Sequence, residues 1–414
     1  MLHYLKRNET LVILCVEAML MMMGVGLISP TLPLYAQTFG VSITMIGLLI
    51  TVFGVARIMA DIPAGHLSEK LGRRPILVAG PLILAIGSVA CGLADSYWEL
   101  LAFRFIQGIG SAMFTTASMI TLADISTPDN RGQVMSIYWG SILLGAGMGP
   151  VVGGFTAQYL GLQAPFFAIA FFAILAALWA YLRLPETRPA GQVTSGLPTN
   201  PELPSANSRT GLKPLLWNLN FILLCTVAFS VFFMRTGAQN QILPLLGSDR
   251  IGLSEGQIGV ALTLVVIMQF ATIFLSGRLS DRFGRKVVIT PGCLIAAASL
   301  VMLAQSYSYW FLLLSCVVMG IGLGISGPTT SAYVADIIPK ENYSSGIGLY
   351  RTIVDLGFVI GPILLGWLAD MRGFSFSLLF NSLLLFLVVF LFQVWAKEPS
   401  RRRGEDTSNL LSNP

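Results

Sequence analysis

Long runs of apolar residues alternate with short polar breaks along most of this chain. The hydrocarbon core of a bilayer is about 30 Å thick and takes about 20 apolar residues per helix, which is the length of these runs. A soluble helical protein would need a polar outer face on each helix, and the runs have none. The pattern therefore predicts an all-α membrane protein with twelve transmembrane helices, at residues 11–34, 44–67, 76–94, 97–122, 134–160, 164–184, 217–245, 255–277, 287–306, 309–333, 346–369 and 373–396.

Lys and Arg residues are concentrated in alternate polar breaks. Lys70, Arg131 and Arg278 belong to the basic set of breaks, whereas the other set holds only Arg250 and Arg372. Short loops rich in Lys and Arg stay on the cytoplasmic side of a membrane. We therefore expect a multi-pass protein of a cell membrane, here a bacterial inner membrane, with both termini in the cytoplasm.

The chain repeats itself at one fixed offset over residues 47–154, without a gap. Gly65 matches Gly277, for example, and Tyr138 matches Tyr350 at the same spacing. Self-similarity over half a chain indicates two homologous halves. The one long polar break is rich in Pro, Ser, Thr, Asn and Gly, which is typical of a flexible linker. The expected domains are a six-helix bundle at 1–184, a cytoplasmic linker at 185–216, a six-helix bundle at 217–397 and a disordered cytoplasmic tail at 398–414.

Composition narrows the class of protein further. The chain is 55% hydrophobic and 11% charged, whereas soluble domains are roughly 25% charged. The net charge of +5 follows from the basic loops and indicates no nucleic-acid partner. The five cysteines lie in apolar runs without CxxC spacing, so we expect neither a metal site nor a disulfide, and no cofactor is expected. No nucleophile–base pair or nucleotide-binding loop is present in the sequence, so an enzyme is not expected.

The breaks after the second and eighth predicted helices carry one motif twice. Residues 65–74 read GHLSEKLGRR, and residues 277–286 read GRLSDRFGRK. This pattern resembles the signature loop of the major facilitator superfamily, GxLxDRxGRR, and the resemblance covers about residues 8–397. It implies two pseudo-symmetric six-helix bundles around a central cavity, working by rocker-switch alternating access.

The motif also implies a gate. A tight turn needs the backbone freedom of Gly72 and Gly284. An acid nearby can sit against the positive N-terminal end of a facing helix. The resemblance implies this contact in the outward-facing state, with the helix that begins near Gly346. The first half departs from the family pattern by carrying Glu69 for Asp and Lys70 for Arg, and a solvated loop that only fixes topology is the alternative. The gating-loop set is Gly65, Glu69, Gly72, Arg73, Arg74, Asp124, Asp281, Gly284 and Arg285, with Asp124 as the implied partner of the loop arginines.

The fourth predicted helix carries an arginine inside the membrane. Arg104, Gln107 and Gly108 resemble the RxxQG motif, which is linked in the superfamily to proton transfer. An intramembrane charge is costly unless it is paired or faces a wet cavity. Either Arg104 faces the cavity and influences proton binding at a nearby carboxyl, or it extends to the membrane interface.

The fifth predicted helix is rich in glycine. It resembles the antiporter motif of the drug:proton antiporter families, GxxxGPxxGG, although Ser136 stands at an earlier glycine position. Glycines four residues apart let two helices approach closely, and a proline permits a kink. The motif favours export, while ordinary close packing is the alternative. Its residues are Gly145, Gly149, Pro150, Gly153 and Gly154.

Charged residues elsewhere within the spans are functional candidates by default. Glu17 lies roughly where drug:proton antiporters carry an acid on helix 1, so it is the best candidate proton site. Arg57 and Arg104 are the cations that can influence proton binding at Glu17, and a static Glu17–Arg57 ion pair is the alternative. The expected proton-coupling set is Glu17, Arg57, Arg104 and Asp61. Arg351 and Asp355 are four residues apart and can pair on one helix face, more for structure than for transport. The remaining cavity candidates are Gln107, Arg235, Gln239 and Asn240.

Together these features predict a secondary transporter that exports hydrophobic or amphiphilic small molecules in exchange for protons. An exporter of lipids, glycolipids or sugars is the alternative, because the intramembrane arginines suit anionic head groups. A transport-dead membrane receptor is a third possibility. We expect a monomer whose partners are the small-molecule substrate, protons and the lipid bilayer.

Overall fold

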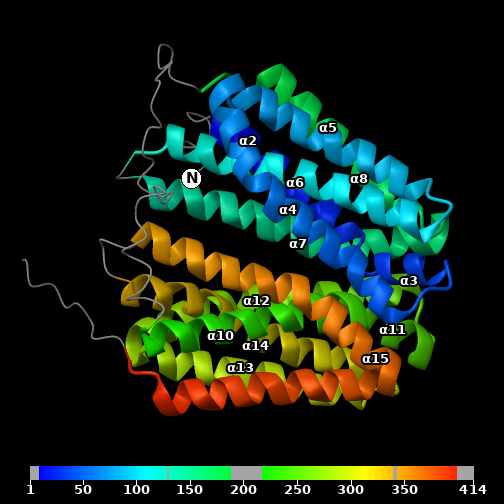
Figure 1. Ribbon diagram of the computed structural model, residues 1–414, viewed down its shortest axis with the longest axis vertical. Coiled ribbons are helices and arrows are strands. Elements are labelled where there is room, and N and C mark those ends of the chain that lie inside the picture. The colour runs from blue at the N-terminus through cyan, green and yellow to red at the C-terminus, as the bar shows by residue number, and fades with distance from the viewer. Residues whose placement is uncertain (1–8, 128–129, 188–216, 339–342, 399–414) are drawn as a thin grey trace, which may run out of the picture.

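The computed structural model describes residues 9–127, 130–187, 217–338 and 343–398, and these are almost entirely helical (Figure 1). The first half contains α2 (Glu9–Leu27), α3 (Leu32–Gln37), α4 (Ile43–Leu71), α5 (Arg73–Gly92), α6 (Tyr97–Ile125), α7 (Arg131–Leu160) and α8 (Ala164–Arg183). The second half contains α10 (Leu219–Phe233), the π-helix η1 (Met234–Ile242), α11 (Leu243–Leu246), the π-helix η2 (Gly247–Ile251), α12 (Glu255–Phe283), α13 (Arg285–Ala304), α14 (Tyr309–Ile337) and α15 (Tyr343–Trp395).

Eleven helical stretches of the described residues are long and apolar enough to cross a membrane. The last of them, in α15, is two helices joined at Gly373, whose φ of 83° and ψ of 170° are not helical. Dividing α15 there gives the predicted twelve spans for the described part of the chain.

Three local features differ from the sequence prediction. The first span ends at Leu27 instead of residue 34, and a separate short helix, α3, follows with Pro33 in its first turn, where proline is tolerated. The seventh span continues to Ile251 through two π-helical segments. The second predicted span ends at residue 67, whereas α4 continues through the first motif to Leu71, so the turn itself is reduced to Gly72.

The internal repeat extends beyond the range visible in the sequence. All six glycines with positive φ among the described residues form three pairs with the same spacing as the sequence repeat: Gly40 with Gly252, Gly72 with Gly284, and Gly161 with Gly373. Helix N-caps repeat in the same way, since Ser42 and Ser254 cap α4 and α12, and Ser96 and Ser308 cap α6 and α14. The two halves therefore share their turns and helix starts as well as their motifs.

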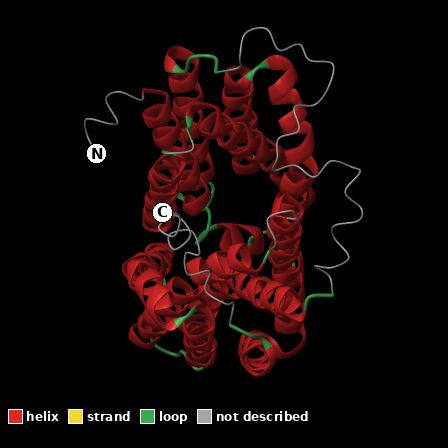
Figure 2. Cartoon of the chain, turned by 90° about the vertical axis from the view of Figure 1, so that its left-hand side faces the viewer, coloured by secondary structure: helices red, strands yellow, loops and turns green. Residues whose placement is uncertain are grey.

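The halves lie one above the other in Figure 1, with α4 and α7 of the first half next to α12 and α15 of the second. One face of the molecule carries the starts of α2 and α7 and the ends of α4, α6 and α8; we call it the termini face. Figure 2 views the molecule from this side, with the helix ends of both halves toward the reader. The opposite face carries α3, α11 and the junction at Gly373.

Candidate transport pathway between the two halves

Two equivalent helix pairs, α7 with α12 and α4 with α15, join the halves toward the face opposite the termini face. Gly259 of α12 packs on the Pro150 carbonyl of α7, so closely that a Cβ would not fit. Gly47 of α4 makes the same contact with the Pro362 carbonyl of α15, at the positions that the internal repeat relates to the first pair. Gly154 likewise packs on the backbone of α12. Small residues at these positions let helices of different halves touch backbone to backbone.

Hydrogen bonds also join the two halves near these glycine contacts. Asp370 of α15 accepts hydrogen bonds from the backbone nitrogens of Ile43 (2.9 Å) and Thr44 (2.8 Å), so a carboxylate sits at the positive N-terminal end of α4. The Thr51 hydroxyl donates to the Val359 carbonyl at 2.6 Å. The two halves are therefore held together at the opposite face.

The halves separate toward the termini face. Among the described residues beyond its own stretch of helix, only Thr116 of the same half would lie within 4 Å of a Cβ at Gly65, at the start of the first motif, and none would at Gly277. Gly47 and Thr51 of α4 contact α15 of the other half, but Gly65 and Gly277 make no such contact between the halves. In the described part of the chain, the hydrogen bonds and glycine contacts that join the halves thus lie toward the opposite face and the middle of the helices, and neither motif glycine contacts the other half.

Each gating motif makes the same set of contacts within its own half. Arg73 Nε donates to Asp124 Oδ2 at 3.0 Å, and Arg285 Nε donates to Asp336 Oδ2 at 3.1 Å. Arg74 donates to the carbonyl of Tyr181, and its guanidinium lies 5.5 Å from the centre of that ring. Glu69 and Asp281 lie in the last turns of α4 and α12, and the Asp281 side chain falls outside the described set.

Two glutamates that the sequence analysis missed complete these motifs. Glu186 accepts hydrogen bonds from the backbone nitrogens of Arg73 (2.9 Å) and Arg74 (3.2 Å), at the N-terminus of α5. Glu398 does the same at the start of α13, accepting from the backbone nitrogens of Arg285 and Lys286. Glu186 lies inside the segment predicted as the linker, and the two glutamates occupy equivalent positions of the internal repeat.

Glu17 is buried without a partner. Its side chain is fully buried in α2, and neither carboxylate oxygen has a hydrogen-bond partner among the described residues. Tyr138 of α7 lies within electrostatic range of this carboxyl. The alternative of a static Glu17–Arg57 ion pair is therefore wrong for this structure.

Arg104 is enclosed within the first half. Its Nη1 donates to Gln107 Oε1 at 2.7 Å, and its guanidinium lies 4.6 Å from the centre of the Phe53 ring. Gln107 Nε2 in turn donates to Ser88 Oγ at 2.7 Å. Arg104 is only 4% exposed, so the alternative in which it extends to the membrane interface is wrong.

Four charged residues meet across the halves. Arg57 and Asp61 lie on α4, and Arg351 and Asp355 lie on α15; we call these four the charge quartet. Asp61 lies within electrostatic range of Arg57 and Arg351, and so does Asp355. None of the four makes an ion pair shorter than 4.0 Å with another, and Arg57 Nε is buried without a hydrogen bond. The structure thus joins residues that the sequence analysis had assigned to separate groups.

The remaining cavity candidates lie on η1. Gln239 is 6% exposed, and its Oε1 has no hydrogen-bond partner. Asn240 accepts a hydrogen bond from Ser29 Oγ of the first half at 3.3 Å. Arg235 is partly buried on the same segment.

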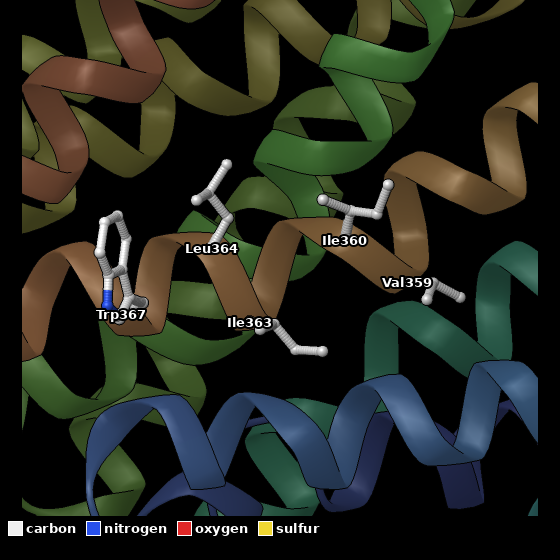
Figure 3. A pocket seen from close by; sticks show the side chains of 5 residues that line it. All are labelled: Val359, Ile360, Ile363, Leu364 and Trp367. Carbon is white, nitrogen blue, oxygen red and sulfur yellow. The ribbon is translucent and has the colours of Figure 1, made fainter.

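One apolar pocket lies along α15 and is shown in Figure 3. Its lining side chains are Val359, Ile360, Ile363, Leu364 and Trp367, all from that one helix. None of the candidate site residues lines this pocket, so it is separate from the polar groups between the halves.

Comparison with known proteins identifies the family. The model of the Major Facilitator Superfamily matches residues 14–254 and 224–411. The chain is 27% identical to an uncharacterized MFS-type transporter of Methanocaldococcus jannaschii over 380 residues, covering 91% of this chain and 96% of the relative. It is 26% identical to Multidrug resistance protein 1 of Bacillus subtilis over 368 residues, covering 88% and 91% of the two chains.

A solved structure shares the fold. A bacterial homolog of the human lysosomal transporter Spinster, in an inward-facing and occupied conformation, aligns with a TM-score of 0.75 at 19% identity, covering 93% of this chain and 96% of that one. This likeness and the family match confirm the predicted fold class. The chain belongs to the Major Facilitator Superfamily and is a multi-pass membrane transporter, not an enzyme.

Proposed function

We propose that this transporter exports hydrophobic or amphiphilic small molecules in exchange for protons by rocker-switch alternating access. The observation that carries the proposal is the buried Glu17 carboxyl, which has no hydrogen-bond partner. An ionised carboxylate without a partner is costly to bury. In our proposal Glu17 therefore holds a proton in this conformation and loses it when the protein rearranges. The multidrug resistance relative supports export as the direction.

The antiporter motif links Glu17 to the other half of the protein. Gly145, Gly149 and Gly153 lie along one face of α7 and pack directly on the backbone of α2, the helix that carries Glu17. Pro150 and Gly154 lie on another face and pack on α12 of the second half. One helix thus touches both the acid-bearing helix and the opposite half, so a change around Glu17 can reach the interface between the halves.

The charge quartet supports the second state of the cycle. Helices α4 and α15 run in opposite directions, since Gly47 lies against Pro362 and Gly54 against Phe358. This register brings Arg57 level with Asp355 and Asp61 level with Arg351. In our proposal the termini face closes when α4 and α15 approach there, and two ion pairs between the halves then form.

The termini face is cytoplasmic in this proposal, as the Lys and Arg distribution requires. In a variant without native cysteines, we expect Ser195→Cys in the linker to resist a membrane-impermeant maleimide in intact cells and to react with a permeant one. Leu160→Cys is the matched control: Leu160 is 76% exposed at the opposite end of α7 and should be labelled from outside. Labelling of Ser195→Cys by the impermeant reagent would reverse the orientation.

Transport itself is tested with purified protein in liposomes. We expect a fluorescent amphiphilic drug to be moved against its gradient when a proton gradient is imposed, and no uphill movement after a protonophore collapses that gradient. Uphill transport that persists without the gradient would exclude proton exchange. No movement of any member of a broad panel of amphiphiles would exclude the substrate class.

A further inference from the structure

Of the four arginines inside the described spans, one has no partner within the part of the chain that the structure describes. Arg104 is hydrogen-bonded to Gln107, and the two arginines of the charge quartet lie within electrostatic range of two carboxylates. Arg235 differs from all three. No hydrogen bond, ion pair or ring contact joins it to another described residue, and no charged group of the described chain lies within electrostatic range. A cation in this position is costly unless something pairs with it.

The backbone presents Arg235 to the space between the halves. It lies in the π-helix η1, where hydrogen bonds run from residue i to i+5, so Arg235, Gln239 and Asn240 stack along one face. Asn240 contacts Ser29 of the first half, which fixes the direction of that face. Arg235 lies about one turn from this contact toward the termini face, just inside the end of the pathway at the opposite face.

The packing of η1 accounts for the position of its polar face. Gly237 lies against the Gly361 carbonyl and the Leu365 side chain of α15, so the other side of η1 is held against its own half. The polar face of η1, where Arg235 and Asn240 are partly exposed, points away from this contact. On this face, the guanidinium of Arg235 and the side-chain amides of Gln239 and Asn240 can donate hydrogen bonds. Carboxylates and phosphates match a guanidinium best, because they accept two parallel hydrogen bonds from it.

We propose that Arg235, with the amides of Gln239 and Asn240, binds a single acidic group, a carboxylate or a phosphate monoester, on an otherwise apolar substrate. The acidic group lies at the end of the pathway near the opposite face, and the apolar part extends between the halves toward the termini face. This inference rests on the proposed function in that the pathway between the halves carries the substrate, and it narrows the substrates to acidic amphiphiles.

Binding to the purified, full-length protein in a neutral maltoside detergent tests this inference. The probes are a fluorescent dodecanoic acid and its methyl ester, measured at a pH at which the acid is ionised. We expect the wild-type protein to bind the acid about tenfold more tightly than the ester, and Arg235→Gln to bind both alike. Arg235→Lys keeps the charge and should keep a preference for the acid. Equal binding of acid and ester by the wild type would overturn the inference.

Two controls separate this site from general effects of charge and folding. Arg250→Gln removes a cation of the same half whose guanidinium donates to the Ala304 carbonyl at 2.9 Å, near the opposite face, and it should retain the full preference. If Arg250→Gln lost the preference as Arg235→Gln does, the site assignment would be wrong. If Arg235→Gln does not fold, a retained preference in Arg235→Lys supports the inference, and a lost preference overturns it.

The acidic group has two possible sources, a small amphiphilic acid or a lipid head group. Competition by lysophosphatidic acid against the fluorescent acid distinguishes them: displacement at a lower concentration than unlabelled dodecanoic acid indicates a lipid, and the reverse order indicates a small acid. Binding and transport can also fail separately. A preference for the acid without uphill export contradicts only the proposed proton exchange, whereas export without the preference contradicts only the role of Arg235.

Discussion

Replacing Glu17 with Gln should abolish uphill, proton-driven export while leaving substrate binding intact. The glutamine side chain has nearly the shape of a protonated glutamate, but it cannot release a proton. The native carboxyl is fully buried and its oxygens lack hydrogen bonds, so the substitution breaks no contact of the described structure. The variant should therefore fold, bind substrate and allow downhill movement, and fail only where a proton must leave.

Transport into liposomes with and without an imposed proton gradient measures this effect. The expected loss of gradient-driven accumulation is complete, to the level of protein-free liposomes. Glu9→Gln is the matched control on the same helix: Glu9 is exposed, 3.4 Å from Arg183, and such surface ion pairs contribute little. If Glu17→Gln retained full proton-driven transport, the proton site would move to Asp61 or Asp355. If every intramembrane acid were dispensable, proton exchange would be excluded.

The transmembrane architecture follows directly from the sequence because each of its determinants is local. Twenty apolar residues specify a span whatever they pack against, and a repeated motif specifies a repeated turn. The prediction was less accurate where hydropathy carries no information. Residues 234–242 form a π-helix, and their hydropathy would be the same if they formed an α-helix, so hydropathy cannot distinguish the two. The end of the first span at Leu27 depends on prolines within a continuous apolar run.

Residues brought together from different helices were the least predictable. Arg57 and Asp355 meet because two helices of different halves pack in one particular rotation, which no periodicity within either helix reveals. Glu186 and Glu398 could have been found, since they are separated by the same offset as the motifs. They form one isolated match, however, outside the range of residues 47–154 in which the repeat is evident. The sequence therefore supplied the candidate residues of the pathway, and the structure was needed to group them.

The second large effect is expected from exchanging charges within the quartet of Arg57, Asp61, Arg351 and Asp355. Two double variants preserve the net charge and separate contacts between the halves from contacts within a helix. Asp61→Arg with Arg351→Asp keeps opposite charges facing each other across the halves but places like charges four residues apart on each helix. Arg351→Asp with Asp355→Arg keeps the pair within α15 but makes like charges face each other across the halves.

We expect the variant that keeps the contacts between the halves to transport at close to the wild-type rate, because like charges four residues apart cost only about 0.2–0.5 kcal/mol per pair. The variant with like charges facing across the halves should be slower by at least about tenfold, since about 1.4 kcal/mol against closure reduces the closed population by that factor. Initial rates of transport measure this difference.

Spin labels at His66→Cys on α4 and Gly348→Cys on α15 report closure directly, and both positions are exposed near the termini face. The slower variant should lack the short-distance population that substrate and a proton gradient induce in the wild type. The opposite order of the two variants would assign the quartet to pairing within each helix and remove it from the gate.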